Sequence, residues 1–481
     1  MLQWIMTFCP LSHLPRNGDE ILLKRNIDWL FLVFLAFSPL LDLASGIQAY
    51  LLNGGTGLLG THQIVIQPSI SISLSVRMAV LVIMALYLLI QRDKQAVLAG
   101  AGLVAAFALS VAGQALRGVS FSLREDILYM ARYSFNIASI FTYAHVLRHM
   151  AQTSGLRRIP APDGPTVALA HPMPDGVRRR IDDILCWTLL IASLGILLPY
   201  LADIGFYTYA DPLGYRGCRG LFYSGNDAAA LMMLLLPLLL CALMRLDGLK
   251  SRRGAAYLAA AACGVTAMLV LGTKTAFLAI GATFAGLAGY ALFYAIWRHQ
   301  SVLLARFGIF LLVFLVFFGI LSLITHNKIG HAIYTSFAFT GEYAASQGLE
   351  TAMLSGRTTK LIAVWHQFQA AMPLSLFTGL GRGSQQAIIE MDVLELIFYY
   401  GIPGTLLMAW VYLKNGILFL CDLFRRFTFT GWCCAISLAL CCGYLFFAGH
   451  TLFSVTSGFY FALVLLYART FSIQPIKEAN P

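Results

Sequence analysis

Two carboxylates stand where a polar stretch of the chain runs into an apolar one. Asp392 and Glu395 are three positions apart, so on a helix they share a face. A carboxylate at a membrane edge can act as a general base towards a sugar hydroxyl when its pKa is raised, and it can also bind sugar hydroxyls without doing chemistry. The simpler interpretation is that acidic residues favour the start of a helix.

Arg357 is placed to hold an anion. Ser355 is a suitable N-cap for a helix that begins near Arg357 and ends before Pro373. A positive charge in the first turn opposes the helix dipole, and a bound anion would offset that cost while using the free backbone N–H groups. We therefore expect Arg357 to contribute to an anion site.

Basic residues in two other loops are candidates for the same kind of site. Arg216 and Arg219 are each followed by glycine, which lets the backbone approach a ligand closely. Arginine binds phosphate through two N–H groups and keeps its charge at physiological pH. Lys274 lies in a Gly-Thr-Lys-Thr turn. A pyrophosphate would suit these residues, and the alternative is that they are solvated charges or contacts to lipid headgroups.

Composition identifies the class of protein that carries these residues. Of 481 residues, 59% are hydrophobic and 11% are charged, whereas about 25% are charged in a soluble domain. Apolar runs of about 20 residues recur along the chain, and each can cross a hydrocarbon core of about 30 Å. The sequence therefore predicts an all-α polytopic membrane protein, with residues 1–481 forming a single integral membrane domain.

We expect about 12 transmembrane helices. They fall at 28–47, 76–90, 96–112, 126–147, 183–201, 228–244, 255–271, 275–297, 307–325, 393–420, 431–449 and 451–467. Two long connections stand out: a basic, proline-containing loop at 148–180 and a large loop with short helices at 326–392, between the ninth and tenth spans. The bias of Lys and Arg towards the inside places both termini and 148–180 in the cytoplasm, and 326–392 outside. Arg77 and Arg132 fall within spans.

Other chemistry has little support in the sequence. The net charge is +11, but the basic residues are scattered among loops, which argues against nucleic-acid binding. Neither a metal-ligand spacing nor a nucleotide-binding motif occurs, so we expect no metal and no cofactor. Four histidines in outside segments could titrate near neutrality, although a lone histidine is more often structural: His326, His331, His366 and His450.

Several segments together resemble the O-antigen ligase and polysaccharide polymerase superfamily. They are RGxRGxFxxxN at 216–226, LGTKTAFLA at 271–279, SGR at 355–357, PLxLFTGLG at 373–381 and ExDxLELxxYYGIPG at 390–404. The resemblance covers about 183–471 and rests on the order, side and spacing of these segments, since no one of them is specific.

The resemblance implies a metal-independent glycosyltransferase of the helical GT-C type in the bacterial inner membrane. Its donor would be an oligosaccharide on undecaprenyl pyrophosphate at the periplasmic face. Its other partners would be an acceptor glycan, the lipid bilayer and, for a polymerase, a chain-length regulator. Asp392, supported by Glu395, would orient or deprotonate the acceptor hydroxyl, and Arg357 would also stabilise the leaving group. The donor pyrophosphate would be bound by four basic residues, Arg216, Arg219, Lys274 and Arg357.

The large loop favours one member of this superfamily over another. Ligases typically carry a histidine just before the tenth span, where this chain has Glu390-Met391-Asp392. That difference favours a polymerase of surface polysaccharide repeat units (O-antigen, capsule or exopolysaccharide). The alternatives are an O-antigen ligase, which transfers the glycan to lipid A-core or to protein, and a transporter or flippase for lipid-linked sugars.

Overall fold

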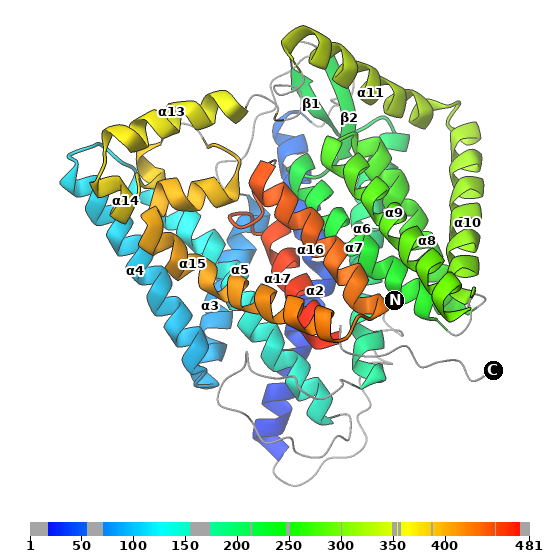
Figure 1. Cartoon of the computed structure of the whole chain (residues 1–481), viewed down its shortest axis with the longest axis horizontal. Helices are drawn as coiled ribbons and strands as arrows, with labels where there is room; N and C mark the ends of the chain where they lie inside the picture. Colours follow the sequence, from blue (N-terminus) through cyan, green and yellow to red (C-terminus); the bar gives the residue numbers. More distant parts are fainter. Residues whose placement is uncertain are drawn as a thin grey trace.

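The chain folds into a bundle of long helices with one two-stranded sheet in the described part (Figure 1). The computed structural model describes residues 18–54, 71–153, 174–211, 214–246, 251–299, 301–348, 354, 357–385, 388–447 and 449–471. Helices therefore dominate the structure, as the composition predicts.

Twelve helices within these residues overlap the expected spans one for one. They are α2 (Gly18–Leu52), α3 (Ile72–Ile90), α4 (Lys94–Leu116), α5 (Leu123–Thr153), α6 (Asp175–Leu201), α7 (Gly225–Arg245), α8 (Arg252–Leu271), α9 (Lys274–Arg298), α10 (Val302–Ile324), α15 (Asp392–Arg425), α16 (Phe429–Phe447) and α17 (Ser457–Phe471). Ten of these described helices are long and apolar enough to cross a membrane. The other two are α5, which carries several charged residues, and α17, which has 15 residues. The prediction of an all-α polytopic membrane protein is confirmed.

The other described elements gather at one face of the bundle, which we call the hairpin face. They are β1 (Phe206–Asp211), β2 (Gly214–Gly220), α11 (Lys328–Gln347), α13 (Arg357–Ala370), α14 (Leu374–Thr378) and the 3₁₀ turn η1 (Arg382–Ser384). Figure 1 shows β1, β2, α11 and α13 together at the top of the view. The last four elements lie in the long loop 326–392. The helix predicted from Arg357 is α13, although its expected cap, Ser355, lies outside the described residues.

The basic loop expected at 148–180 is described only at its two ends. Helix α5 continues to Thr153 and α6 begins at Asp175, so helices cover 148–153 and 175–180. Residues 154–173 lie outside the described residues. The cytoplasmic position of this loop stays a prediction.

The hairpin of β1 and β2 is fixed on the turn between α8 and α9. Gly217 has a φ of 61°, and a Cβ there would lie 2.2 Å from the carbonyl oxygen of Leu271, so glycine is required. The hydroxyl of Thr208 donates a hydrogen bond of 2.7 Å to the same oxygen. This contact brings the β2 strand, with Arg216, next to Lys274 at the start of α9.

Helix α15 consists of two helical segments joined at Gly401, where φ is 66°. Pro403 has no N–H, so the carbonyl oxygen of Tyr399 lacks its usual helical donor. That oxygen instead accepts hydrogen bonds from the backbone N–H of Gly381, at 3.0 Å, and from the hydroxyl of Ser110, at 2.9 Å. The kink is thereby held against α4 and the loop after α14, and it fixes the first segment of α15 at the hairpin face.

Candidate active site

Asp392, Glu395 and a histidine from a different loop form one cluster. The two carboxylates lie in the first turn of α15, and His450 lies in the connection between α16 and α17. Nδ1 of His450 is 3.6 Å from Oδ1 of Asp392 and 3.5 Å from Oε2 of Glu395. Both carboxylate side chains are fully buried, while the histidine side chain is 29% exposed. The cluster therefore presents an imidazole, backed by two carboxylates.

Asp392 joins the start of α15 to the connection that carries the histidine. Its Oδ2 accepts hydrogen bonds from the backbone N–H groups of Thr451 and Leu452, the second at 2.7 Å. Hydrogen bonds to an ionised acceptor are shorter and stronger than those between neutral groups. Asp392 therefore fixes the position of His450 twice, through the backbone that follows it and through its ring.

Glu395 connects the same cluster to Glu390, which pairs with two cations. Its Oε2 accepts a hydrogen bond from the hydroxyl of Tyr129 on α5, and its Oε1 accepts one of 2.8 Å from the backbone N–H of Glu390. The Glu390 carboxylate pairs with Nη2 of Arg357 at 2.9 Å and with Nζ of Lys360 at 3.3 Å. Burial opposes ionisation of Glu390, but these two cations outweigh it and hold the pKa of Glu390 below its ordinary value.

His450 carries a proton at neutral pH. Burial by itself would lower the pKa of the imidazole, but the charges of Glu395, Asp392 and Glu390 outweigh burial and raise the pKa of His450 to about 9. One N–H at Nδ1 then faces both carboxylates. Donor atoms of Asp392, Glu395 and His450 lie within 4.8 Å of one another, a spacing that the ligands of one metal ion also have. Nδ1 of His450 and Oδ1 of Asp392 are buried and make no hydrogen bond among the described residues, so the contacts at 3.5 and 3.6 Å are ionic contacts.

Three of the predicted pyrophosphate ligands lie together. The ammonium group of Lys274 lies close enough to Arg216 and Arg357 to interact electrostatically with both guanidinium groups. The guanidinium of Arg216 lies 4.6 Å from the ring centre of Tyr209 and 3.4 Å from that of Phe339 on α11. Like charges held near one another create a positive potential that favours a multivalent anion. The hairpin, the α8–α9 turn and the start of α13 thus converge on one cationic group.

Arg219 lies apart from this group. It is three positions from Arg216 on β2, and its guanidinium packs 5.1 Å from the ring centre of Phe206. Burial lowers the pKa of Arg219, and the nearby Tyr223 partly offsets the effect. Tyr223 in turn interacts electrostatically with both Arg219 and Arg132, the second of which lies on α5. The structure therefore separates the two arginines that the sequence pairs.

A polar cavity of about 280 Å³ lies beside the carboxylate–histidine cluster. His450 contributes to its wall, as do side chains of α2, α3, α5 and α7 and the loops that precede α7 and α17. The charged and hydroxyl-bearing members of the wall include Asp42, Ser73, Arg132, Asp227, Ser454 and Thr456. Among the described residues, none of the six predicted site residues lines this cavity.

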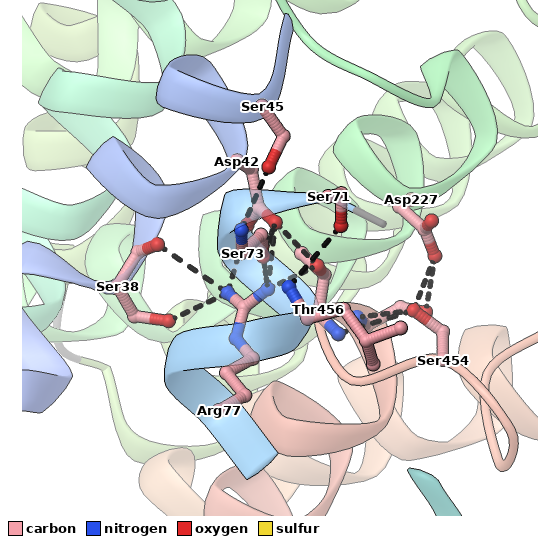
Figure 2. Close-up of polar contacts among 11 residues, drawn as sticks. Ser38, Asp42, Ser45, Ser71, Ser73, Arg77, Asp227, Ser454 and Thr456 are labelled. Atoms are coloured by element: carbon pink, nitrogen blue, oxygen red, sulfur yellow. Dashed lines mark hydrogen bonds and ion pairs between the residues drawn. The ribbon is translucent and has the colours of Figure 1, made fainter. Parts of the chain in front are cut away.

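A buried ion pair that the sequence does not predict supports the cavity. Arg77 on α3 is fully buried, and its guanidinium pairs with both carboxylate oxygens of Asp42 on α2, at 2.6 and 2.9 Å (Figure 2). It also donates hydrogen bonds to the hydroxyls of Ser38 and Thr456, at 2.8 and 2.9 Å. An ionisable residue within a span is the signal that could have led to this network. Its partner could not be read from the sequence, because Asp42 is 35 positions away.

A comparison with families of known proteins finds one match. Residues 173–333 match the family model described as O-antigen ligase like membrane protein, whereas no curated protein matches the chain. The matched segment includes the hairpin with Arg216 and Arg219 and the α8–α9 turn with Lys274, while Asp392 and His450 lie beyond it. Over this segment, the chain is similar to the family of O-antigen ligase like membrane proteins.

Proposed function

We propose that the chain is a glycosyltransferase that polymerises repeat units of a surface polysaccharide. The donor is a glycan on undecaprenyl pyrophosphate, and the acceptor is the hydroxyl of a second lipid-linked glycan. We propose further that the hairpin face lies at the periplasmic side of the bacterial inner membrane, with both termini in the cytoplasm. The observation that carries the proposal is His450, which is held by two buried carboxylates at the edge of a polar cavity.

The arrangement of His450 supports a role as general base. Its Nδ1 faces Asp392 and Glu395, so Nε2 is the ring atom left to take a proton from an acceptor hydroxyl. The neutral imidazole takes that proton, the hydroxyl oxygen forms a bond to the anomeric carbon of the donor, and the bond from that carbon to the pyrophosphate breaks. The configuration at the carbon is inverted. The two carboxylates stabilise the imidazolium that forms.

This mechanism changes the part assigned to the two carboxylates. Both are fully buried, and Oδ2 of Asp392 is already engaged by two backbone N–H groups. In the proposal they do not touch the acceptor. Asp392 and Glu395 act through the histidine, whose position and charge they set.

The cationic group supports the departure of the pyrophosphate. Arg216, Lys274 and Arg357 gather positive charge from three different elements, and this charge would stabilise the anion that leaves. Loss of one such group costs about 10²–10³-fold in rate in enzymes that stabilise a developing anion. Arg219 stays a proposed pyrophosphate ligand, although its guanidinium packs against the ring of Phe206.

Alanine substitutions of the cationic residues and of His450 test the proposal. Arg216→Ala, Lys274→Ala, Arg357→Ala and His450→Ala should each give folded protein in the membrane that yields glycans of a single repeat unit. Arg426→Ala serves as a matched control, because Arg426 is exposed at the far end of α15. Normal long chains from all four site variants would refute the proposal.

A ligase is the second candidate, because the matched family is described by that activity. The two activities leave different products when the gene is removed. Loss of a polymerase leaves single repeat units attached to their usual acceptor. Loss of a ligase leaves long polymer that is not attached to lipid A-core or protein. We place the polymerase first because this chain has Glu390-Met391-Asp392 at the position where ligases of the superfamily that it resembles carry a histidine.

A further inference from the structure

We propose that the cavity beside His450 is the acceptor subsite and that it takes a neutral sugar ring. This inference rests on the proposed function, since it assigns the cavity to the glycan that is attacked. The volume of about 280 Å³ is just below the range of about 300–1,000 Å³ that is usual for drug-sized ligands. A ligand of one or two sugar rings suits that size better than a lipid tail.

The wall of the cavity offers the groups that a sugar requires. A sugar ring has hydroxyls around its edge, each of which can donate and accept hydrogen bonds, and apolar C–H faces. Serine and threonine hydroxyls line one part of the cavity, from Ser45 and Ser73 to Thr456. Aromatic rings line another part, where Tyr129 and Phe453 stack with their ring centres 4.0 Å apart. The cavity thus combines polar partners with flat apolar surfaces.

The charges around the cavity favour a neutral ligand over a phosphate. The Asp42 carboxylate is neutralised by Arg77, which lies 2.6 Å away. The wall also holds the carboxyl group of Asp227 and the guanidinium of Arg132. The anion-binding charges, Arg216, Lys274 and Arg357, lie elsewhere. A phosphate would have to share the cavity with the carboxylate of Asp227, whereas a sugar hydroxyl would donate a hydrogen bond to it.

Asp227 is the residue best placed to bind a sugar hydroxyl. Its Oδ1 accepts hydrogen bonds from the hydroxyls of Ser454 and Ser457, at 2.6 and 2.9 Å. These bonds fix the carboxylate at the start of α7 and leave Oδ2 for a ligand (Figure 2). A hydrogen bond to a charged acceptor contributes more to binding than one between neutral groups. We expect the Asp227 carboxylate to set much of the affinity for the acceptor.

The buried Arg77 network holds the floor of the cavity in place. Arg77 and Asp42 both bond the hydroxyl of Thr456, at 2.9 and 2.8 Å, which ties α2 and α3 to the connection before α17 (Figure 2). In that connection the hydroxyl of Ser454 accepts the backbone N–H of Thr456. The same connection carries His450, so the floor and the proposed base are held by one framework.

The position of the cavity fits an inverting displacement. The carboxylate of Glu390 interacts electrostatically with both His450 and Arg357. The histidine therefore lies close to the cationic group, and it also lines the cavity. The cations Arg357 and Lys274 do not line the described cavity. Pyrophosphate and acceptor would therefore occupy separate subsites near His450, and a displacement requires the two ligands to be bound side by side without overlap.

The test measures sugar binding without relying on transfer. Purified full-length protein in lipid nanodiscs is probed by saturation-transfer NMR with methyl glycosides of glucose, galactose and mannose. Inorganic pyrophosphate serves as the probe of the cationic group. Asp227→Asn keeps the shape of the side chain and removes its charge. Leu74→Trp fills the cavity without changing a charged group, since Leu74 lines it. Asp203→Asn, at an exposed carboxylate on the same face, is the matched control.

We expect at least one glycoside to bind the wild-type protein and the Asp203→Asn control. Asp227→Asn should weaken that binding about tenfold or more. Leu74→Trp should abolish it, and both variants should bind pyrophosphate normally. Wild-type protein that binds none of the glycosides, or variants that bind them as the wild type does, would overturn the inference. So would displacement of the glycoside by pyrophosphate, because the cavity would then be the anion site. Sugar binding in a protein that transfers nothing would instead count against the proposed function alone.

Discussion

Replacing Glu395 with glutamine should shift the pH profile of the glycan transfer rate to lower pH. The pKa of His450 is raised from 6.5 to about 9, so the protein favours the imidazolium by about 3 kcal/mol relative to water. Glu395 is the largest of the charges that raise this pKa, ahead of Asp392 and Glu390. Asp227 on α7 also faces the imidazolium. A general base must be neutral to act, and in the wild-type protein that form is scarce at pH 7.

The expected result is a change in the pH at which the rate levels off. In the wild-type protein the initial rate should rise about tenfold per pH unit between about 6.5 and 9 and then level off. In Glu395→Gln the rise should end closer to 6.5, because the imidazole loses its strongest anionic partner. The assay is the initial rate of glycan transfer in nanodiscs at saturating donor, from pH 6 to 10.

Two further variants make this result specific. His450→Gln should transfer slowly and without the rise. Glu342→Gln, at an exposed carboxylate on α11, should keep the wild-type profile. A wild-type rate that is flat between about 6.5 and 9, or a profile that Glu395→Gln leaves in place, would refute the assignment of His450 as a base held by these carboxylates.

Four other outcomes follow from the same geometry. Because the pKa of His450 is raised, its ionic contacts stabilise the fold fully below pH 6.5 or so, and this stabilisation is lost as the pH rises through about 9. The melting temperature of the wild-type protein should therefore exceed that of His450→Gln at low pH, and the difference should vanish by about pH 9. Asp392→Asn should lower the free energy of unfolding by about 1–3 kcal/mol in a denaturation series, since it removes the ionised acceptor of two backbone N–H groups. Gly217→Ala should lower both melting temperature and transfer rate, whereas Gly176→Ala, which has open space around it, should change neither. Treatment with a chelator should leave transfer intact, and activity that is lost and then restored by a divalent cation would show instead that the cluster holds a metal.

The helical framework could be predicted from the sequence because its signals are local. Ten of the twelve expected spans coincide with described helices that are long and apolar enough to cross a membrane, since a run of apolar residues determines a membrane helix without reference to its neighbours. The start of α13 at Arg357 and its end before Pro373 follow from the same kind of local evidence. The kink of α15 at Gly401 has a local signal too, in the Gly-Ile-Pro sequence, although the sequence predicts one uninterrupted span there.

The candidate site could be predicted only in part. The sequence identifies Asp392 and Glu395 as neighbours on a helix, and it identifies basic residues that the fold brings together as Arg216, Lys274 and Arg357. It also pairs Arg216 with Arg219, whereas the irregular register of the hairpin places Arg216 against Tyr209 and Arg219 against Phe206.

The sequence by itself determined the membrane helices, the polar loop segments and the residue types available for chemistry. The tertiary structure alone decided that His450 meets two carboxylates more than fifty positions away and that Arg77 bonds Thr456 across 379 positions. The physical reason is that hydrophobicity and capping act over one or two helical turns. The pairing of buried charges depends on which helices pack together, and no local pattern records that choice.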